Sequence, residues 1–144
     1  MKKQVLRIVV GTMALLAALA AMAQAPSGKV LVNVPFEFVI DNHHMQPGRY
    51  LVTSAANGFL QIHDTAAADN QMFLQVNSIY SNKPNEAKLV FHRYGDTYFL
   101  SEVWNGNGSV GREVVKSKAE KEILAGRFNP SRPKAEVAVV RPEQ

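Results

Sequence analysis

Residues 88–104, KLVFHRYGDTYFLSEVW, are the stretch of the chain that best predicts its fold. Two segments rich in β-branched and aromatic residues flank Gly95-Asp96, and a two-residue loop with glycine in first place is typical of a tight β-hairpin. A loop of this length also fixes which residues lie opposite each other. The predicted facing pairs are Arg93–Tyr98, Phe91–Leu100, Leu89–Glu102 and His92–Phe99.

Both faces of this predicted hairpin carry aromatic side chains. The more apolar face includes Phe91 and Leu100 and ends at Trp104, so we expect it to point inward. His92 and Phe99 lie on the opposite face. Such a hairpin is either covered on both sides or lines a cavity. The candidate ligand-facing residues are Phe91, Tyr98, Phe99 and Trp104.

Alternating patterns predict further strands along the chain. Residues 30–40 alternate apolar and other residues, which is typical of a strand with one buried face. Pro35 cannot donate to a ladder, so this strand lies at an edge, is bulged or is split there. Residues 41–48 are predicted to be a polar loop, and Asn57-Gly58 is typical of a hairpin turn. The remaining predicted strands are residues 49–54, 59–63, 72–80 and 110–115.

The pattern changes after the last of these strands. Ser117 and Glu120 have the spacing of a capping box, which predicts a short helix that ends at Gly126. We therefore expect residues 24–126 to be a single all-β domain, an antiparallel sandwich or small barrel of six to eight strands with one short C-terminal helix. Residues 127–144 contain three prolines and are predicted to be a poorly ordered tail, although residues 136–140 could add a strand.

The first 23 residues have the layout of a secretory signal peptide. A basic start is followed by an apolar run and then by Ala21-Met22-Ala23, so we expect cleavage between Ala23 and Gln24. The apolar run is shorter than the roughly 20 residues needed to cross a bilayer, so we expect no transmembrane span after cleavage. The sequence thus predicts an exported protein, either periplasmic or secreted.

Charge and composition exclude several classes of function. The full chain has 16 basic and 12 acidic residues, but three of the bases lie in the predicted signal peptide. The mature chain would carry 13 bases and 12 acids, a net charge of +1, which is not the basic footprint of a nucleic-acid-binding protein. The absence of cysteine removes thiol nucleophiles, thiolate metal sites and disulfides.

The motifs in the chain do not predict an active site. Residues 106–111 match G-x-G-x-x-G, but a predicted strand follows where the dinucleotide-binding motif needs a helix. No G-x-S-x-G nucleophile elbow is present. The four histidines lack the convergent spacing of metal ligands. We therefore predict no catalytic residue, no cofactor and no metal site.

Three segments give the chain a family resemblance. They are VPFEF at residues 34–38, PGRY at residues 47–50 and the 88–104 stretch. Together they resemble an uncharacterised family of small exported bacterial β proteins, over roughly residues 30–126. Gln46 departs from this family, because the alanine of its usual Pro-Ala-Gly-x-Tyr turn is missing here. The resemblance implies an exported β domain, and no activity or site residue follows from it.

These observations favour an exported non-catalytic module of the cell envelope or secreted space, which binds an envelope or extracellular partner or has a structural role. Two alternatives stay open. One is a small-barrel carrier that holds an apolar ligand among its aromatic residues, which requires an internal cavity. The other is an enzyme on a β scaffold, which requires two titratable side chains that converge in a cleft.

Overall fold

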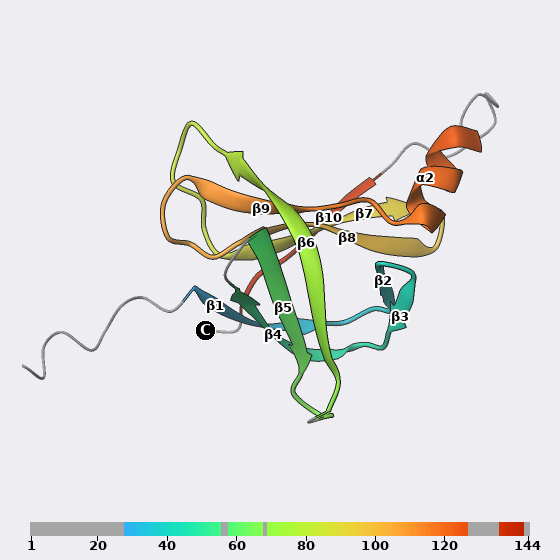
Figure 1. The fold of residues 1–144 in the computed structure, drawn as a ribbon, viewed down its shortest axis with the longest axis horizontal. Helices are drawn as coiled ribbons and strands as arrows, with labels where there is room; N and C mark the ends of the chain where they lie inside the picture. Colours follow the sequence, from blue (N-terminus) through green and yellow to red (C-terminus); the bar gives the residue numbers. More distant parts are fainter. Residues whose placement is uncertain (1–27, 56–57, 68, 127–135, 143–144) are drawn as a thin grey trace, which may run out of the picture.

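The computed structural model describes residues 28–55, 58–67, 69–126 and 136–142, and Figure 1 shows how they are arranged. They form a ten-stranded sheet and one short helix, which confirms the predicted all-β class. The predicted signal peptide and its cleavage site lie outside the described residues. The strands are β1 (Lys29–Val34), β2 (Phe38–Ile40), β3 (His43–Met45), β4 (Gly48–Ser54), β5 (Phe59–Asp64), β6 (Gln71–Tyr80), β7 (Lys88–Tyr94), β8 (Thr97–Trp104), β9 (Val110–Val114) and β10 (Glu136–Val140), and the helix is α2 (Lys118–Ala125).

Strands β1, β4, β5 and the first half of β6 make the first layer of the molecule, each antiparallel to its neighbour. Their side chains alternate between the interior and solvent, as the period-two pattern predicts. The predicted hairpin between β4 and β5 is confirmed, and Gly58 in its turn has a φ of 77°. This left-handed conformation favours glycine.

The long strand β6 connects the two layers (Figure 1). Its first half pairs with β5, and its second half pairs with β9. Strands β9, β8, β7 and β10 continue the second layer, all antiparallel. The chain therefore forms one bent sheet folded over on itself rather than two separate sheets.

Proline divides the segment that was predicted as a single strand at residues 30–40. The chain leaves β1 at Val34, passes Pro35 and re-enters the sheet as β2, which runs parallel to the start of β8. The expected polar loop at residues 41–48 is wrong in part, because residues 43–45 form β3 against β2. Asp41 and Asn42, with φ values of 44° and 73°, make the tight turn between these strands. Asparagine and aspartate tolerate this left-handed conformation better than most residues.

The C-terminal segment also differs from the prediction. Residues 136–140 form β10 along β7, so the tail is not poorly ordered throughout, and residues 127–135 lie outside the described part. Ala138 and Val140 pack against the main core, and Glu136 is 3.3 Å from Arg93 across the strand pair. Together with the division at Pro35 and the extra strand β3, β10 explains why ten strands form where six to eight were predicted.

The two ends of the sheet approach each other without closing a barrel. Val32 in β1 makes one isolated bridge to Pro142, just beyond β10. Pro142 and Pro35 both lack an N–H group, so neither can extend a ladder along this seam. Within the described residues, no helix is long and apolar enough to cross a membrane.

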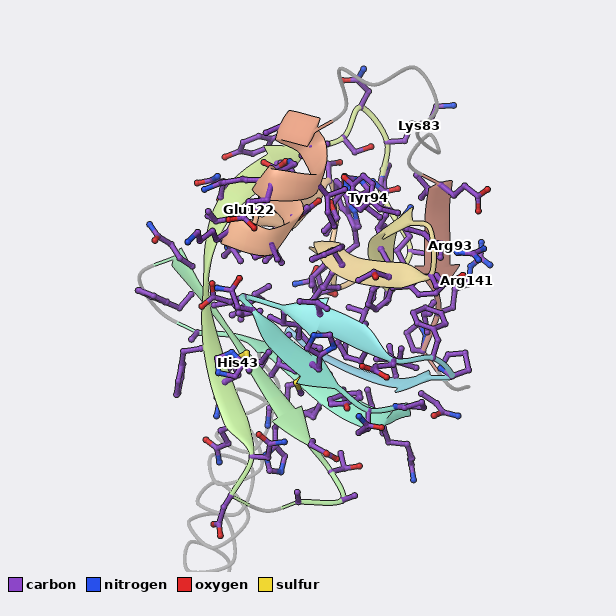
Figure 2. The ribbon with its side chains drawn as sticks, turned by 90° about the vertical axis from the view of Figure 1, so that its right-hand side faces the viewer. His43, Lys83, Arg93, Tyr94, Glu122 and Arg141 are labelled. Carbon is purple, nitrogen blue, oxygen red and sulfur yellow. The ribbon has the colours of Figure 1, made fainter. Side chains whose placement is uncertain are left out.

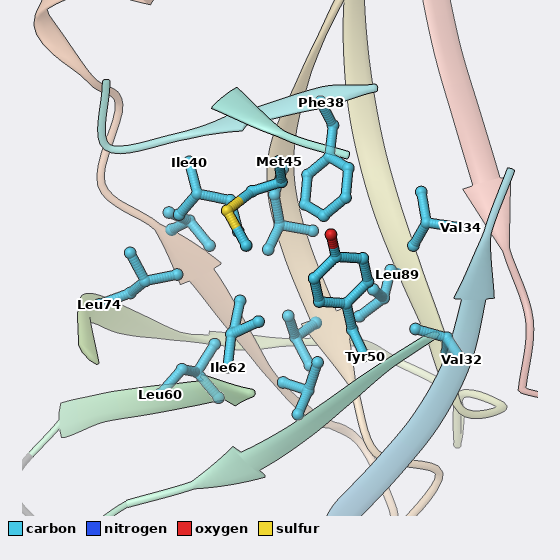
Figure 3. Packing of buried hydrophobic residues seen from close by; sticks show 14 of the residues in the cluster. Val32, Val34, Phe38, Ile40, Met45, Tyr50, Leu60, Ile62, Leu74 and Leu89 are labelled. Atoms are coloured by element: carbon cyan, nitrogen blue, oxygen red, sulfur yellow. The ribbon is translucent and has the colours of Figure 1, made fainter. Parts of the chain in front are cut away.

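The main core fills the space between the two layers (Figure 3). Tyr50 and Phe38 pack edge to face at its centre, with ring centroids 5.2 Å apart, and Phe91 meets Phe38 in the same way at 5.3 Å. All three side chains are almost fully buried. A fully buried aromatic contributes several kcal/mol to stability, so a domain without disulfides can be stabilised by this core alone.

Candidate functional site

The four aromatic residues predicted to face a ligand do not line one cavity. Phe91 is fully buried in the main core. Tyr98 stacks on Phe36, whose ring also meets Phe91 edge to face at 5.2 Å. Phe99 lies on the other side of the sheet beneath α2, in a second cluster with Tyr94. Of the two predicted alternatives, a hairpin covered on both sides or one that lines a cavity, the structure shows the first.

A bulge in β8 explains why the aromatic residues separate. Phe91 faces Leu100 as predicted, but Val90 faces Glu102, so Ser101 is an extra residue without a partner in the ladder. The predicted Leu89–Glu102 pair is therefore wrong, and Leu89 faces Val103 instead. Both of these residues belong to the main core. A residue inserted into a strand reverses the inward–outward alternation beyond it.

The bulge moves Trp104 to the outside of the sheet, so the prediction that it shares a face with Phe91 is wrong. Its ring lies over Gly111 on the neighbouring strand, where an added Cβ would come within 2.8 Å of the ring. Its indole N–H donates to Glu102 Oε2 at 2.8 Å, and Lys88 Nζ lies 5.8 Å from the ring centroid. Trp104 is only 6% exposed, so it is buried by the Gly111 backbone and these polar contacts on the face of the sheet opposite the main core.

The same bulge brings Ser101 next to a histidine. Ser101 Oγ and His92 Nε2 are 3.3 Å apart. The other ring nitrogen of His92, Nδ1, lies 3.5 Å from Glu120 Oε1 in α2. Serine, imidazole and carboxylate therefore follow one another in a line that runs from β8 through β7 to the helix. We call Ser101, His92, Glu120 and Tyr94 the polar cluster.

The helix positions the carboxylate of the polar cluster. Ser117 Oγ accepts a hydrogen bond from the Glu120 backbone N–H at 3.1 Å, which confirms the predicted N-cap. The other half of the predicted capping box is not formed, because the Glu120 side chain turns to the sheet and accepts from Tyr94 Oη at 3.1 Å. Figure 2 shows Tyr94 on the sheet close to α2. Apolar contacts hold the helix there, between Ala119, Ile123 and Leu124 of α2 and Val39, Tyr94 and Phe99 of the sheet.

Glu120 and Ser101 of the polar cluster are buried, and His92 is partly exposed. Glu120 is 3% exposed and Ser101 is 6% exposed, whereas the His92 side chain keeps 26% of its surface. His92 Nδ1 is buried and makes no hydrogen bond to any described residue. A buried polar atom without a partner is costly, so an Nδ1–H group directed at Glu120 is the tautomer that best fits this environment.

The sequence analysis did not predict the polar cluster, although two of its features follow from sequence patterns. Glu120 lies three and four residues before Ile123 and Leu124, so it shares their buried helical face. His92 was correctly placed opposite Phe99, two positions from Ser101. Neither pattern reveals the bulge or where the helix docks. These depend on contacts between residues distant in the sequence.

The outer face of the first layer is a second candidate site. It consists of the outward positions of β1, β4, β5 and the first half of β6, which carry no acidic residue. Leu31, Phe59 and Phe73 are 37%, 41% and 61% exposed there. Gln61 lies opposite Phe73 and donates to Gln71 Oε1 at 2.8 Å. Basic and amide side chains, among them Lys29 and Arg49, occupy other outward positions of the same strands. Exposed large apolar side chains on such a mixed face are compatible with an interaction surface.

Three surface pockets on the described residues are small. They measure about 80, 140 and 150 Å³, below the roughly 300 Å³ at which small-molecule sites usually begin. The pocket of about 140 Å³ is lined in part by Glu37 and His44, which are 2.9 Å apart. None of the three is lined by the four predicted aromatic residues. Among the described residues, no three histidine or acidic side chains gather closely enough to hold a metal ion.

Comparisons with protein-family models, with curated proteins and with solved structures gave no significant match. The resemblance to a family of exported β proteins therefore stays a prediction.

Proposed function

We propose that this chain is an exported, non-catalytic module of the cell envelope or secreted space that acts by binding a partner through the outer face of its first layer. The observation that carries the proposal is the exposure of Leu31, Phe59 and Phe73 on one acid-free face. Exposing several large apolar side chains on one sheet face is unfavourable in water unless a partner covers them.

The placement of the other aromatic residues also supports binding at the surface. Phe91 and Phe99 each pack within a core cluster, on opposite sides of the sheet. A carrier of an apolar ligand would need these side chains to line a cavity of a few hundred Å³. The three small surface pockets fit such a ligand poorly.

The test is native mass spectrometry of the full-length protein purified from its own host under mild conditions. We expect a component that co-purifies in a fixed ratio and dissociates when the complex is activated in the gas phase. A preparation that contains the bare chain alone, across several salt concentrations and growth phases, would contradict the proposal.

A further inference from the structure

We propose that Ser101 is an activated nucleophile that accepts one acyl group from an activated ester, so that the polar cluster is a site of covalent acylation. This proposal concerns the second layer and does not depend on the binding face of the first layer. It rests on the order of the atoms in the polar cluster and on their burial.

The order of atoms is the one that a serine nucleophile needs. A hydroxyl next to an imidazole nitrogen can lose its proton to that nitrogen as it attacks. Ser101 Oγ is 3.3 Å from His92 Nε2, and the opposite ring nitrogen is 3.5 Å from Glu120 Oε1. A carboxylate on the far side of the ring holds the imidazole in the tautomer that leaves Nε2 free to accept a proton.

The Glu120 carboxylate lies where it can stabilise a positive charge on His92. It is 3% exposed, and it accepts hydrogen bonds from no described side chain other than Tyr94. A positive charge that develops on His92 during attack would therefore lie beside a poorly solvated negative charge, where the attraction is stronger than in water. The 3.5 Å separation is longer than a good hydrogen bond, and such bonds often shorten when a reaction begins.

The bulge gives Ser101 its orientation. Residues 99 and 100 pair with His92 and Phe91, whereas Ser101 has no partner in the ladder with β7. Bulges commonly redirect a side chain next to active sites. Ser101 is 6% exposed and the neighbouring His92 side chain is 26% exposed, so we expect the electrophile to be small, such as an acetyl ester.

The proposed step balances in atoms and charge. Ser101 Oγ forms a bond to the acyl carbon, the bond from that carbon to the leaving phenolate oxygen breaks, and the serine proton passes to His92 Nε2 and then to solvent. An activated aryl ester has a good leaving group, whereas the serine ester that forms is an unactivated alkyl ester. Acylation is therefore faster than hydrolysis of the product, and a burst of one equivalent is expected.

The experiment uses the purified full chain and p-nitrophenyl acetate. We expect a burst of about one equivalent of p-nitrophenolate per chain, with an acetyl group located on Ser101 by peptide mass mapping. Ser101→Ala should abolish the burst, and Glu120→Gln should slow it about tenfold or more. Ser54→Ala is the matched control, because Ser54 is an exposed serine at the end of β4 and should leave the burst unchanged.

Three outcomes would overturn the proposal. One is a burst of unchanged size in Ser101→Ala. Another is acetylation confined to lysines or to the N-terminus. The third is a Glu120→Gln variant with a lower melting temperature but an unchanged burst rate, which would show that Glu120 only anchors the helix and that His92 and Glu120 do not activate Ser101. Melting curves for every variant distinguish a loss of reactivity from a loss of folding.

Discussion

Tyr50 places a phenol group at the centre of the main core. Its ring packs edge to face on Phe38 in the main core, and its hydroxyl donates to the carbonyl oxygen of Gln46. Burial raises the pKa of the Tyr50 phenol above its usual 10.0, and the charge of Asp64 adds to this effect. Burial therefore disfavours the charged form of Tyr50 in the folded chain.

The raised pKa gives a prediction for alkaline solution. The folded chain keeps the Tyr50 proton to a higher pH than the unfolded chain does, so its stabilising effect is complete below pH 10 and is lost as pH rises through the raised value. Tyr50→Phe should cost about 1 kcal/mol at pH 8, from the lost hydrogen bond. That difference from wild type should shrink at pH 11 in urea unfolding experiments.

Tyr80→Phe is the matched control for this prediction, since Tyr80 is 78% exposed and contributes no burial effect. Its difference from wild type should be the same at both pH values. A Tyr50→Phe deficit that stays constant or grows between pH 8 and pH 11 would contradict the role given to the phenol.

The bulge at Ser101 could not be predicted from the sequence. The two-residue loop at Gly95-Asp96 gave the correct register as far as Phe91 and Leu100. Beyond them, one extra residue reversed the alternation and moved Trp104 to the face of the sheet opposite the main core, where it is still buried. A bulge arises from packing against distant strands and the helix, and no local pattern in the hairpin sequence marks it.

At the scale of elements, β10 is the strand whose role the sequence left open. Figure 2 shows Arg93 and Arg141 on the side of the molecule that carries β10. The strand is short and valine-rich. Its sequence does not alternate between apolar and polar residues, so the pattern alone is a weak indication of a strand. Its pairing with β7 and the contact of Ala138 and Val140 with the main core give it a defined place.

Two neighbouring substitutions test this placement of β10. Ala138→Asp would put a charge against the main core and should lower the free energy of unfolding by about 2–4 kcal/mol. Val137→Asp places the same charge on a side chain that is 64% exposed, so the loss should be under about 1 kcal/mol. Urea unfolding of both variants measures the difference, and equal losses would mean that β10 does not have the inward and outward faces described.

The prolines show what composition can and cannot predict about elements. Pro35 indicated an edge, a bulge or a division in the strand, and the structure selects the division. The parallel pairing of β2 with β8 could not be derived in this way, since it joins segments about sixty residues apart. Local patterns predicted most of the antiparallel hairpins, whose partners lie close together in the sequence.

At the scale of the whole molecule, the two layers carry different chemistry. The second layer is covered in part by α2 and holds the polar cluster, whereas the first layer presents an exposed, acid-free face to solvent. The alternating sequence patterns predict which residues of each first-layer strand point outward. The sequence does not predict that this face lies away from α2, because that depends on how β6 pairs with β5 in one layer and with β9 in the other.

The outer face of the first layer is the proposed binding surface of the protein. The most direct measurement compares the amount of each variant retained on envelope fractions of the host, at equal protein concentration. Phe59→Ser combined with Phe73→Ser should reduce retention about tenfold. Val137→Ser combined with Val139→Ser, which alters exposed apolar residues of the second layer, should bind as wild type does. Equal retention of the first variant and wild type, with both folded, would contradict the claim.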